Sequence, residues 1–187
     1  MKFEKIVFLM ITISICTVLI TTQLQTQDSI SVLVNNSGPY IGTAIPHDYG
    51  FDGSGIIISV IDTGVDFNHP DLLGLGLDGK IIGGYDFVDN DETPQDSNGH
   101  GTQVAGIIAA NGNLKGIAPN SKILAYRVSE DGESVSSNLI IKAIEKSISD
   151  NADIINISLG INQTNKKIDQ IVKKAVQNNT FVVTAAG

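Results

Sequence analysis

Short apolar runs alternate along this chain with segments whose apolar residues recur at helical spacing. The run from Ile56 to Ile61, bounded by Gly55 and Asp62, predicts a strand buried on both faces. Predicted strands cover residues 56–61, 80–87, 122–128, 153–159 and 180–185, and predicted helices cover residues 101–110, 140–148 and 168–176. Strands that alternate with helices predict an α/β fold, with a doubly wound, mostly parallel sheet and helices on both faces. An active site in such a fold is expected beyond the carboxyl ends of the strands.

The N-terminal segment has a different pattern. Lys2 and Lys5 precede an apolar run over residues 6–20. A bilayer span needs about 20 apolar residues, whereas the apolar part of a secretory signal needs about 7–15. The run therefore favours a signal peptide, but an uncleaved anchor stays open because no small-x-small cleavage site follows. Residues 1–23 are predicted to be a signal peptide or N-terminal anchor, residues 24–41 a linker or short pro-region, and residues 42–187 the folded domain.

Composition narrows the class of protein. A chain of 187 residues, 42% hydrophobic and 17% charged, suits one folded domain. Lys and Arg number 12 against 20 Asp and Glu, which gives a net charge of -8. That acidic balance argues against a nucleic-acid partner, because phosphates require a basic face. The single cysteine, Cys16, excludes an internal disulfide.

Two segments carry residues suited to acid–base chemistry. Asp62 follows the first predicted strand and precedes Thr-Gly, while His100 lies between two glycines at the start of a predicted helix. Each has an ordinary explanation when taken alone, because aspartate caps helices and turns and histidine occurs in loops. If the two meet in one crevice, the aspartate would bond one imidazole nitrogen, fix the tautomer and leave the other nitrogen as a general base.

A set of motifs in a fixed order connects these residues to a known family. They are Asp62-Thr63-Gly64, then His100-Gly101-Thr102 with Val-Ala-Gly following, then Gly116-Ile117-Ala118-Pro119, Asn156-Ile157-Ser158-Leu159-Gly160 and Ala185-Ala186-Gly187. Together they resemble the subtilisin-like serine peptidases, from about residue 42 to residue 187. The resemblance implies a subtilisin-like fold and a serine-type endopeptidase that hydrolyses peptide bonds with an Asp-His-Ser triad.

The resemblance also implies roles for individual residues. Asp62 would orient the histidine, and His100 would be the general base and later the general acid. Two backbone edges would bind the substrate as an added strand. Their residues would be Ser158, Leu159 and Gly160 on one edge and Gly132, Glu133 and Ser134 on the other.

The chain departs from the family where the nucleophile is expected. Its sequence contains no Gly-Thr-Ser-x-Ala segment and no Asn after Ala185-Ala186-Gly187, although that Asn would donate into the oxyanion hole. We therefore expect residues 42–187 to be a partial peptidase domain, truncated at the C-terminus, and the isolated chain to be inactive. The alternative is a catalytically inactive remnant that acts as a peptide-binding module.

An acidic loop before the histidine suggests a metal. By the same resemblance, calcium would be held by Asp86, Asp89, Asp91, Thr93 and Gln95, which offer the hard oxygen ligands that Ca²⁺ prefers. A solvated acidic turn is the other interpretation. We expect a polypeptide substrate, no nucleic acid and a monomer. The location is expected to be either secreted or extracellular and membrane-anchored, and in the second case the N-terminal apolar segment would be the tether.

Overall fold

The computed structural model describes residue 38 and residues 41–76, 79–133, 135–161 and 165–185. The predicted signal or anchor segment, Ser134 and the final Ala-Gly lie outside these residues. Within the described residues, no helix is both long and apolar enough to cross a lipid bilayer.

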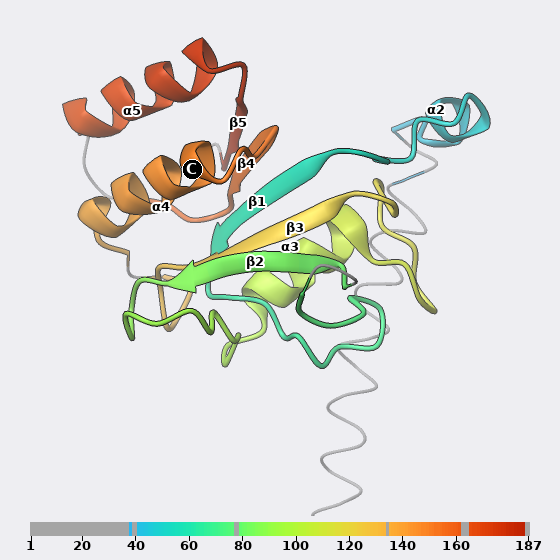
Figure 1. Ribbon diagram of the computed structural model, residues 1–187, viewed down its shortest axis with the longest axis horizontal. Helices are drawn as coiled ribbons and strands as arrows, with labels where there is room; N and C mark the ends of the chain where they lie inside the picture. The colour runs from blue at the N-terminus through green and yellow to red at the C-terminus, as the bar shows by residue number, and fades with distance from the viewer. Residues whose placement is uncertain (1–37, 39–40, 77–78, 134, 162–164, 186–187) are drawn as a thin grey trace, which may run out of the picture.

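The fold is a five-stranded parallel sheet with helices between the strands (Figure 1). The elements are α2 Ala44–Asp48, β1 Ile57–Asp62, β2 Ile81–Asp86, α3 His100–Ala109, β3 Lys122–Arg127, α4 Ser137–Ser149, β4 Ile154–Ile157, α5 Lys166–Gln177 and β5 Phe181–Thr184. The strand order is β2-β3-β1-β4-β5, and every pairing is parallel. The predicted α/β fold is therefore confirmed.

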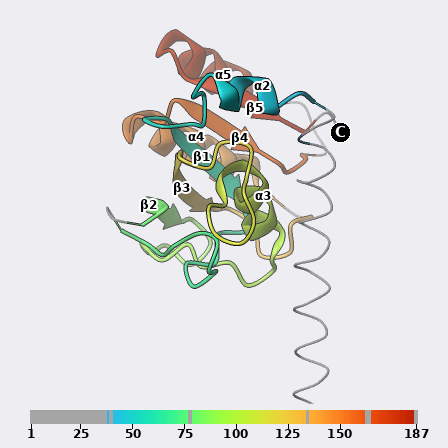
Figure 2. The same cartoon turned by 90° about the vertical axis from the view of Figure 1, so that its right-hand side faces the viewer.

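Two hydrophobic clusters lie on opposite faces of the sheet, because successive side chains of a strand point to opposite sides. In β3, Ile123 and Ala125 belong to the cluster that includes Ala105 of α3, whereas Leu124 and Tyr126 belong to the cluster formed with α4 and α5. Figure 2 shows α3 well separated from α4 and α5. Strands β1 and β3 are buried on both sides, which explains their unbroken apolar sequences.

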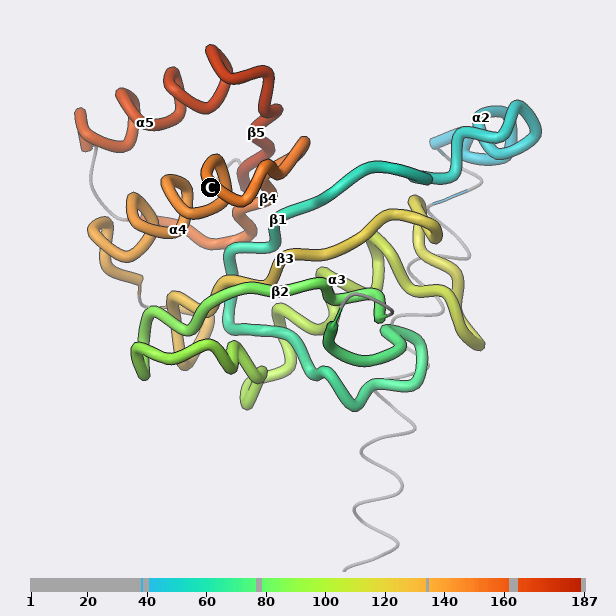
Figure 3. The backbone as a smooth tube through the Cα atoms, in the orientation of Figure 1, coloured from blue at the N-terminus to red at the C-terminus, as the bar shows by residue number. Residues whose placement is uncertain are grey.

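The predicted elements differ from the observed ones mainly at their ends, by one to three residues. Among the elements whose bounds are given above, the short helix α2 was not predicted, although it lies at the start of the predicted folded domain. It contains Pro46 and buries none of its residues, so no apolar periodicity marks it. Figure 3 traces α2 into the amino end of β1, away from the carboxyl ends where the candidate site lies.

Candidate active site

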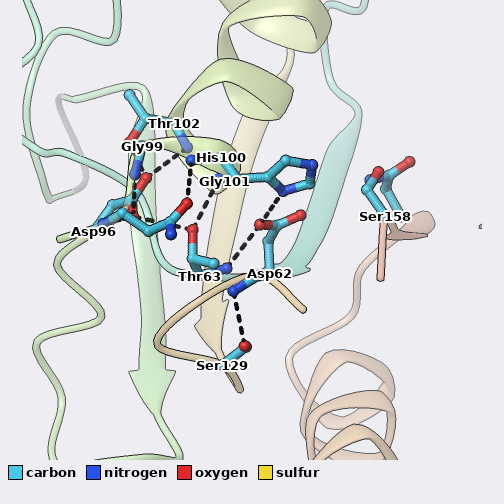
Figure 4. Close-up of polar contacts among 12 residues, drawn as sticks. Asp62, Thr63, Asp96, Gly99, His100, Gly101, Thr102, Ser129 and Ser158 are labelled. Atoms are coloured by element: carbon cyan, nitrogen blue, oxygen red, sulfur yellow. Dashed lines mark hydrogen bonds and ion pairs between the residues drawn. The ribbon is translucent and has the colours of Figure 1, made fainter. Parts of the chain in front are cut away.

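Asp62 is the last residue of β1 and is completely buried. Its Oδ1 accepts hydrogen bonds from the backbone N–H of Thr63, at 2.7 Å, and from His100 Nδ1, also at 2.7 Å (Figure 4). Its Oδ2 has no hydrogen-bond partner among the described residues. Burial raises the pKa of Asp62, the bonds from His100 and Thr63 oppose that rise, and the nearby charge of Asp96 adds to it.

His100 is the first residue of α3, and the glycines on either side allow it to approach β1. Gly99 has a φ of 106°, in the left-handed region that glycine adopts readily. A Cβ on Gly101 would lie 2.1 Å from the carbonyl oxygen of Gly64 and 3.1 Å from the side chain of Asp62. Only a residue without a side chain fits there, so Gly101 lets the start of the helix lie directly against the end of the strand.

The Asp62–His100 pair is asymmetric, with one partner buried and the other accessible. The side chain of His100 is 43% exposed, whereas that of Asp62 is 0% exposed. An ionised carboxylate only accepts hydrogen bonds, so it holds the proton on Nδ1 and leaves Nε2 as the basic nitrogen. The structure therefore brings together the two residues that the sequence singled out, in an arrangement suited to a general base.

Asp96 lies beside this pair and was not among the predicted site residues. Its Oδ1 accepts from the backbone N–H of Asn98 and of Gly99, and its Oδ2 from that of Thr102, all at 2.9 Å. The only sequence signal is an aspartate a few residues before a helix. That is the ordinary pattern of a turn that precedes a cap, so it does not single out a functional residue.

The structure describes all three residues of the first predicted substrate edge. Ser158 follows β4, and Figure 4 shows it across the His100 ring from Asp96. Asn156 Nδ2 donates to Ser158 Oγ at 2.9 Å. Leu159 is buried and Gly160 is exposed.

The opposing edge begins at a turn that also lies close to the histidine. Gly132 has a φ of 77°, and a Cβ built on it would lie 3.9 Å from that of His100. The backbone N–H of Glu133 donates to Asp131 Oδ1 at 2.9 Å. Ser134, the third predicted residue of this edge, lies outside the described residues.

The acidic loop places an arginine against its first two carboxylates. Asp86 Oδ2 and Asp89 Oδ2 each accept from the same nitrogen of Arg127, at 2.7 Å. Asp86 Oδ1 accepts from the backbone N–H groups of Val88 and Asp89. Burial disfavours the charge of Arg127, but the hydrogen bonds to Asp86 and Asp89 and their negative charges outweigh it and raise the pKa of Arg127.

The other predicted calcium ligands do not converge on the same point. Asp91 Oδ1 accepts from the backbone N–H of Thr93, and Gln95 Nε2 donates to Asp66. Across the described part of the chain, no three His, Cys, Asp or Glu side chains are grouped so as to hold a metal ion. The ligands are chemically suitable for calcium, but their present arrangement does not fit the ion. Calcium binding stays a prediction.

A cavity of about 470 Å³ lies at the opposite end of the sheet. It is lined by α2 and the loop before β3, where His47 Nε2 contacts the carbonyl oxygen of Ile117 at 2.7 Å. Neither Asp62 nor His100 lines it. The cavity is therefore separate from the acid–base pair, which lies on the carboxyl side where parallel α/β sheets hold their ligands.

Comparisons with known proteins show which family the chain resembles. The model of the Subtilase family matches residues 53–187. The chain is 39% identical over 175 residues to the minor extracellular protease Vpr of Bacillus subtilis (strain 168), covering 86% of this chain and 21% of that protein. It is 44% identical over 140 residues to thermitase of Thermoactinomyces vulgaris, covering 73% of this chain and 48% of that protein. It is 39% identical over 145 residues to subtilisin E of Bacillus subtilis (strain 168), covering 75% of this chain and 36% of that protein. The chain thus spans between about a fifth and a half of these relatives.

Proposed function

Because this chain belongs to the subtilase family, we propose that it supplies the Asp–His part of the catalytic triad of a serine-type endopeptidase. The observation that carries the proposal is the 2.7 Å contact between Asp62 Oδ1 and His100 Nδ1. A buried acceptor behind a half-exposed imidazole is the arrangement that a general base in acyl transfer requires.

The proposed chemistry assigns each side chain a proton-handling role. His100 Nε2 takes the proton of the serine hydroxyl as its oxygen attacks the peptide carbonyl. It then gives that proton to the leaving amine, and the acyl-enzyme that remains is hydrolysed by water through the same two steps. Asp62 stays ionised, holds the imidazole ring in place and stabilises the imidazolium cation while it exists.

The substrate is proposed to be an extended polypeptide segment. The backbone at Ser158-Leu159-Gly160 and at Gly132-Glu133 would pair with such a segment as neighbouring strands do. The contact from Asn156 to Ser158 Oγ supports this role, because it fixes the first edge where it leaves β4.

The sequence contains no Gly-Thr-Ser-x-Ala segment, so we infer that residues 1–187 alone do not complete the reaction. The pair would then activate a serine that these residues do not provide. An isolated chain that binds peptide without hydrolysing it would behave as a binding module, which is the second function that the sequence allows.

Export from the cell is the third part of the proposal. It is supported by the two lysines and the apolar run near the N-terminus, and by the printed name of one relative, a minor extracellular protease. Whether the segment is cleaved or remains as an anchor is a question for N-terminal sequencing of the mature protein.

Hydrolysis of an unfolded polypeptide by the protein that carries this chain tests the proposed activity. His100→Ala should lower the rate by about 10⁶-fold, because the general base is lost. His47→Ala, at the other end of the sheet, is the matched control and should leave the rate unchanged. A His100→Ala variant with the wild-type rate would exclude the proposed function, and turnover by residues 1–187 alone would exclude the inferred lack of a nucleophile.

A further inference from the structure

Asp96 connects the end of β1 to the start of α3 through more hydrogen bonds than the backbone turn alone requires. Besides three backbone N–H groups, its carboxylate accepts from two hydroxyls. Thr63 Oγ1 donates to Asp96 Oδ1 at 3.0 Å, and Thr102 Oγ1 donates to Asp96 Oδ2 at 2.5 Å. Thr63 is completely buried and follows Asp62, whereas Thr102 belongs to the first turn of the helix that begins with His100.

The carboxylate of Asp96 fixes the hydrogen-bond direction of the Thr63 and Thr102 hydroxyls. A hydroxyl has one proton to donate, so a threonine that donates to Asp96 offers its oxygen as an acceptor elsewhere. Thr63 Oγ1 accepts from the backbone N–H of Gly101 at 2.9 Å, and Thr102 Oγ1 accepts from the backbone N–H of Asp66 at 2.9 Å. Each threonine thus holds the segment opposite its own, one from the strand to the helix and the other from the helix to the turn after the strand.

Both connections lie directly beside the acid–base pair. The backbone N–H of Thr63 donates to the same oxygen of Asp62 that His100 contacts, and Gly101 is the next residue after His100. We propose that Asp96 is a positioning residue, which sets the separation of Asp62 and His100 and thereby keeps the proton of the neutral imidazole on Nδ1. The catalytic meaning of this role rests on the proposed function, but the position of the proton can be measured without any turnover.

Geometry and charge can be separated with two different substitutions. Asp96→Asn removes the negative charge and places either a donor or a single acceptor opposite the N–H of Thr102. Thr63→Val keeps the charge of Asp96 and the shape of the side chain but removes the hydroxyl that holds Gly101. If position is what matters, both variants should weaken the Asp62–His100 contact, and the double variant should add little to either single change.

The ¹⁵N chemical shifts of the imidazole nitrogens test this in the chain labelled at histidine, at a pH where the ring is neutral. There are three histidines, so His47 and His69 act as internal references. We expect the Nδ1–H form of His100 in the wild type. In Asp96→Asn and Thr63→Val the ratio of Nδ1–H to Nε2–H should fall about fivefold, the effect of one lost hydrogen bond. Thr63→Ser retains the hydroxyl and should restore the wild-type shifts.

The control is Asp52→Asn. Asp52 also accepts hydrogen bonds from a turn N–H and an amide side chain, but it lies at the opposite end of the sheet. It should leave the His100 shifts unchanged. The proposal is wrong if Asp96→Asn and Thr63→Val both retain the wild-type shifts, or if Asp52→Asn alters them as much. A failed peptidase assay with the expected shifts would count against the proposed function and leave the positioning role supported.

Discussion

Two strands of the sheet end in a buried aspartate, and their partners differ. Asp62 closes β1 and Asp86 closes β2, and they are 0% and 2% exposed. In both residues Oδ1 accepts from a following backbone N–H. Asp62 meets the half-exposed His100, whereas Asp86 meets the buried guanidinium of Arg127. The same local sequence feature thus leads to an acid–base pair in one strand and to a closed ion pair in the other.

The partner decides which of the two can take part in chemistry. Arginine stays charged at every accessible pH, so the Asp86–Arg127 pair cannot exchange a proton with a substrate. A histidine can take up and release a proton, and the side chain of His100 is 43% exposed. Each pair also leaves one buried polar atom without a partner among the described residues, Oδ2 of Asp62 and Nε of Arg127. We expect the loss of one partner to cost more in the structural pair, because it leaves a buried charge without a counter-ion. The predictions below test that contrast.

The largest expected effect is on the structural pair. Arg127→Met leaves the carboxylate of Asp86 buried without a counter-ion, which should lower the free energy of unfolding by about 3–5 kcal/mol. Lys146→Met removes a lysine paired with Asp150 on an exposed helix face, and it should cost about 0–1 kcal/mol. Urea unfolding of both variants measures the difference. Equal losses would mean that Asp86–Arg127 is no more important than a surface pair.

The next effect concerns the close approach that forms the functional pair. Gly101→Ala places a methyl group 2.1 Å from a backbone carbonyl oxygen, so α3 must shift, at a cost of about 1–3 kcal/mol. Gly106→Ala lies in the same helix, where an added Cβ meets nothing within 4 Å, and should stabilise by about 0.4–1 kcal/mol. Thermal unfolding of the two variants compares them. If both behave alike, contact between the helix start and β1 does not constrain the site.

A smaller effect should appear in the pH dependence of stability. The pKa of Asp62 is raised in the folded state, chiefly by burial, so the folded protein binds its proton more tightly than the unfolded chain. The wild type therefore loses stability relative to Asp62→Asn as the pH rises from below 3.8 through the raised pKa. Unfolding of both proteins from about pH 2 to about pH 7, in buffers of constant ionic strength, measures this.

Asp52 is the control for that experiment, because its pKa is shifted in the direction opposite to that of Asp62. Hydrogen bonds from Ser54 and Asn120 lower its pKa to about 2. Its contribution to stability is therefore present above pH 3.8 and is lost as the pH falls toward 2, and solvent screening keeps it small. If Asp62→Asn and Asp52→Asn change stability with pH in the same direction, burial does not dominate at Asp62.

The smallest effect is expected from calcium at the 86–95 loop. Because Arg127 already pairs with Asp86 and Asp89, millimolar Ca²⁺ should change the Tm of the wild type little and that of Arg127→Met more. A chelator should reverse any change. A larger gain in the wild type would show that the carboxylates turn from the arginine to the ion, as the resemblance to other subtilases predicts.

The sequence pattern predicted the strands of the sheet, and the order of the motifs, through the family resemblance, predicted that Asp62 and His100 act together. Unbroken apolar runs marked β1 and β3, and the carboxyl ends of parallel strands converge at one edge of a sheet. The partner of Asp86 was not predictable, because Arg127 is 41 residues away and only strand order brings it close. Asp96 was missed for a different reason, since its turn has no pattern that distinguishes a positioning role from a cap. Helix α2 lacks any buried face that a periodicity could reveal.

The central claim is that Asp62 and His100 act as one catalytic pair. The direct test is the rate at which the protein that carries this chain hydrolyses an unfolded polypeptide, compared between the wild type and Asp62→Asn. The substitution keeps the shape of the side chain but no longer holds the proton on Nδ1, so kcat should fall about 10⁴-fold. Asp52→Asn should leave kcat unchanged. A kcat for Asp62→Asn equal to that of the wild type would contradict the claim.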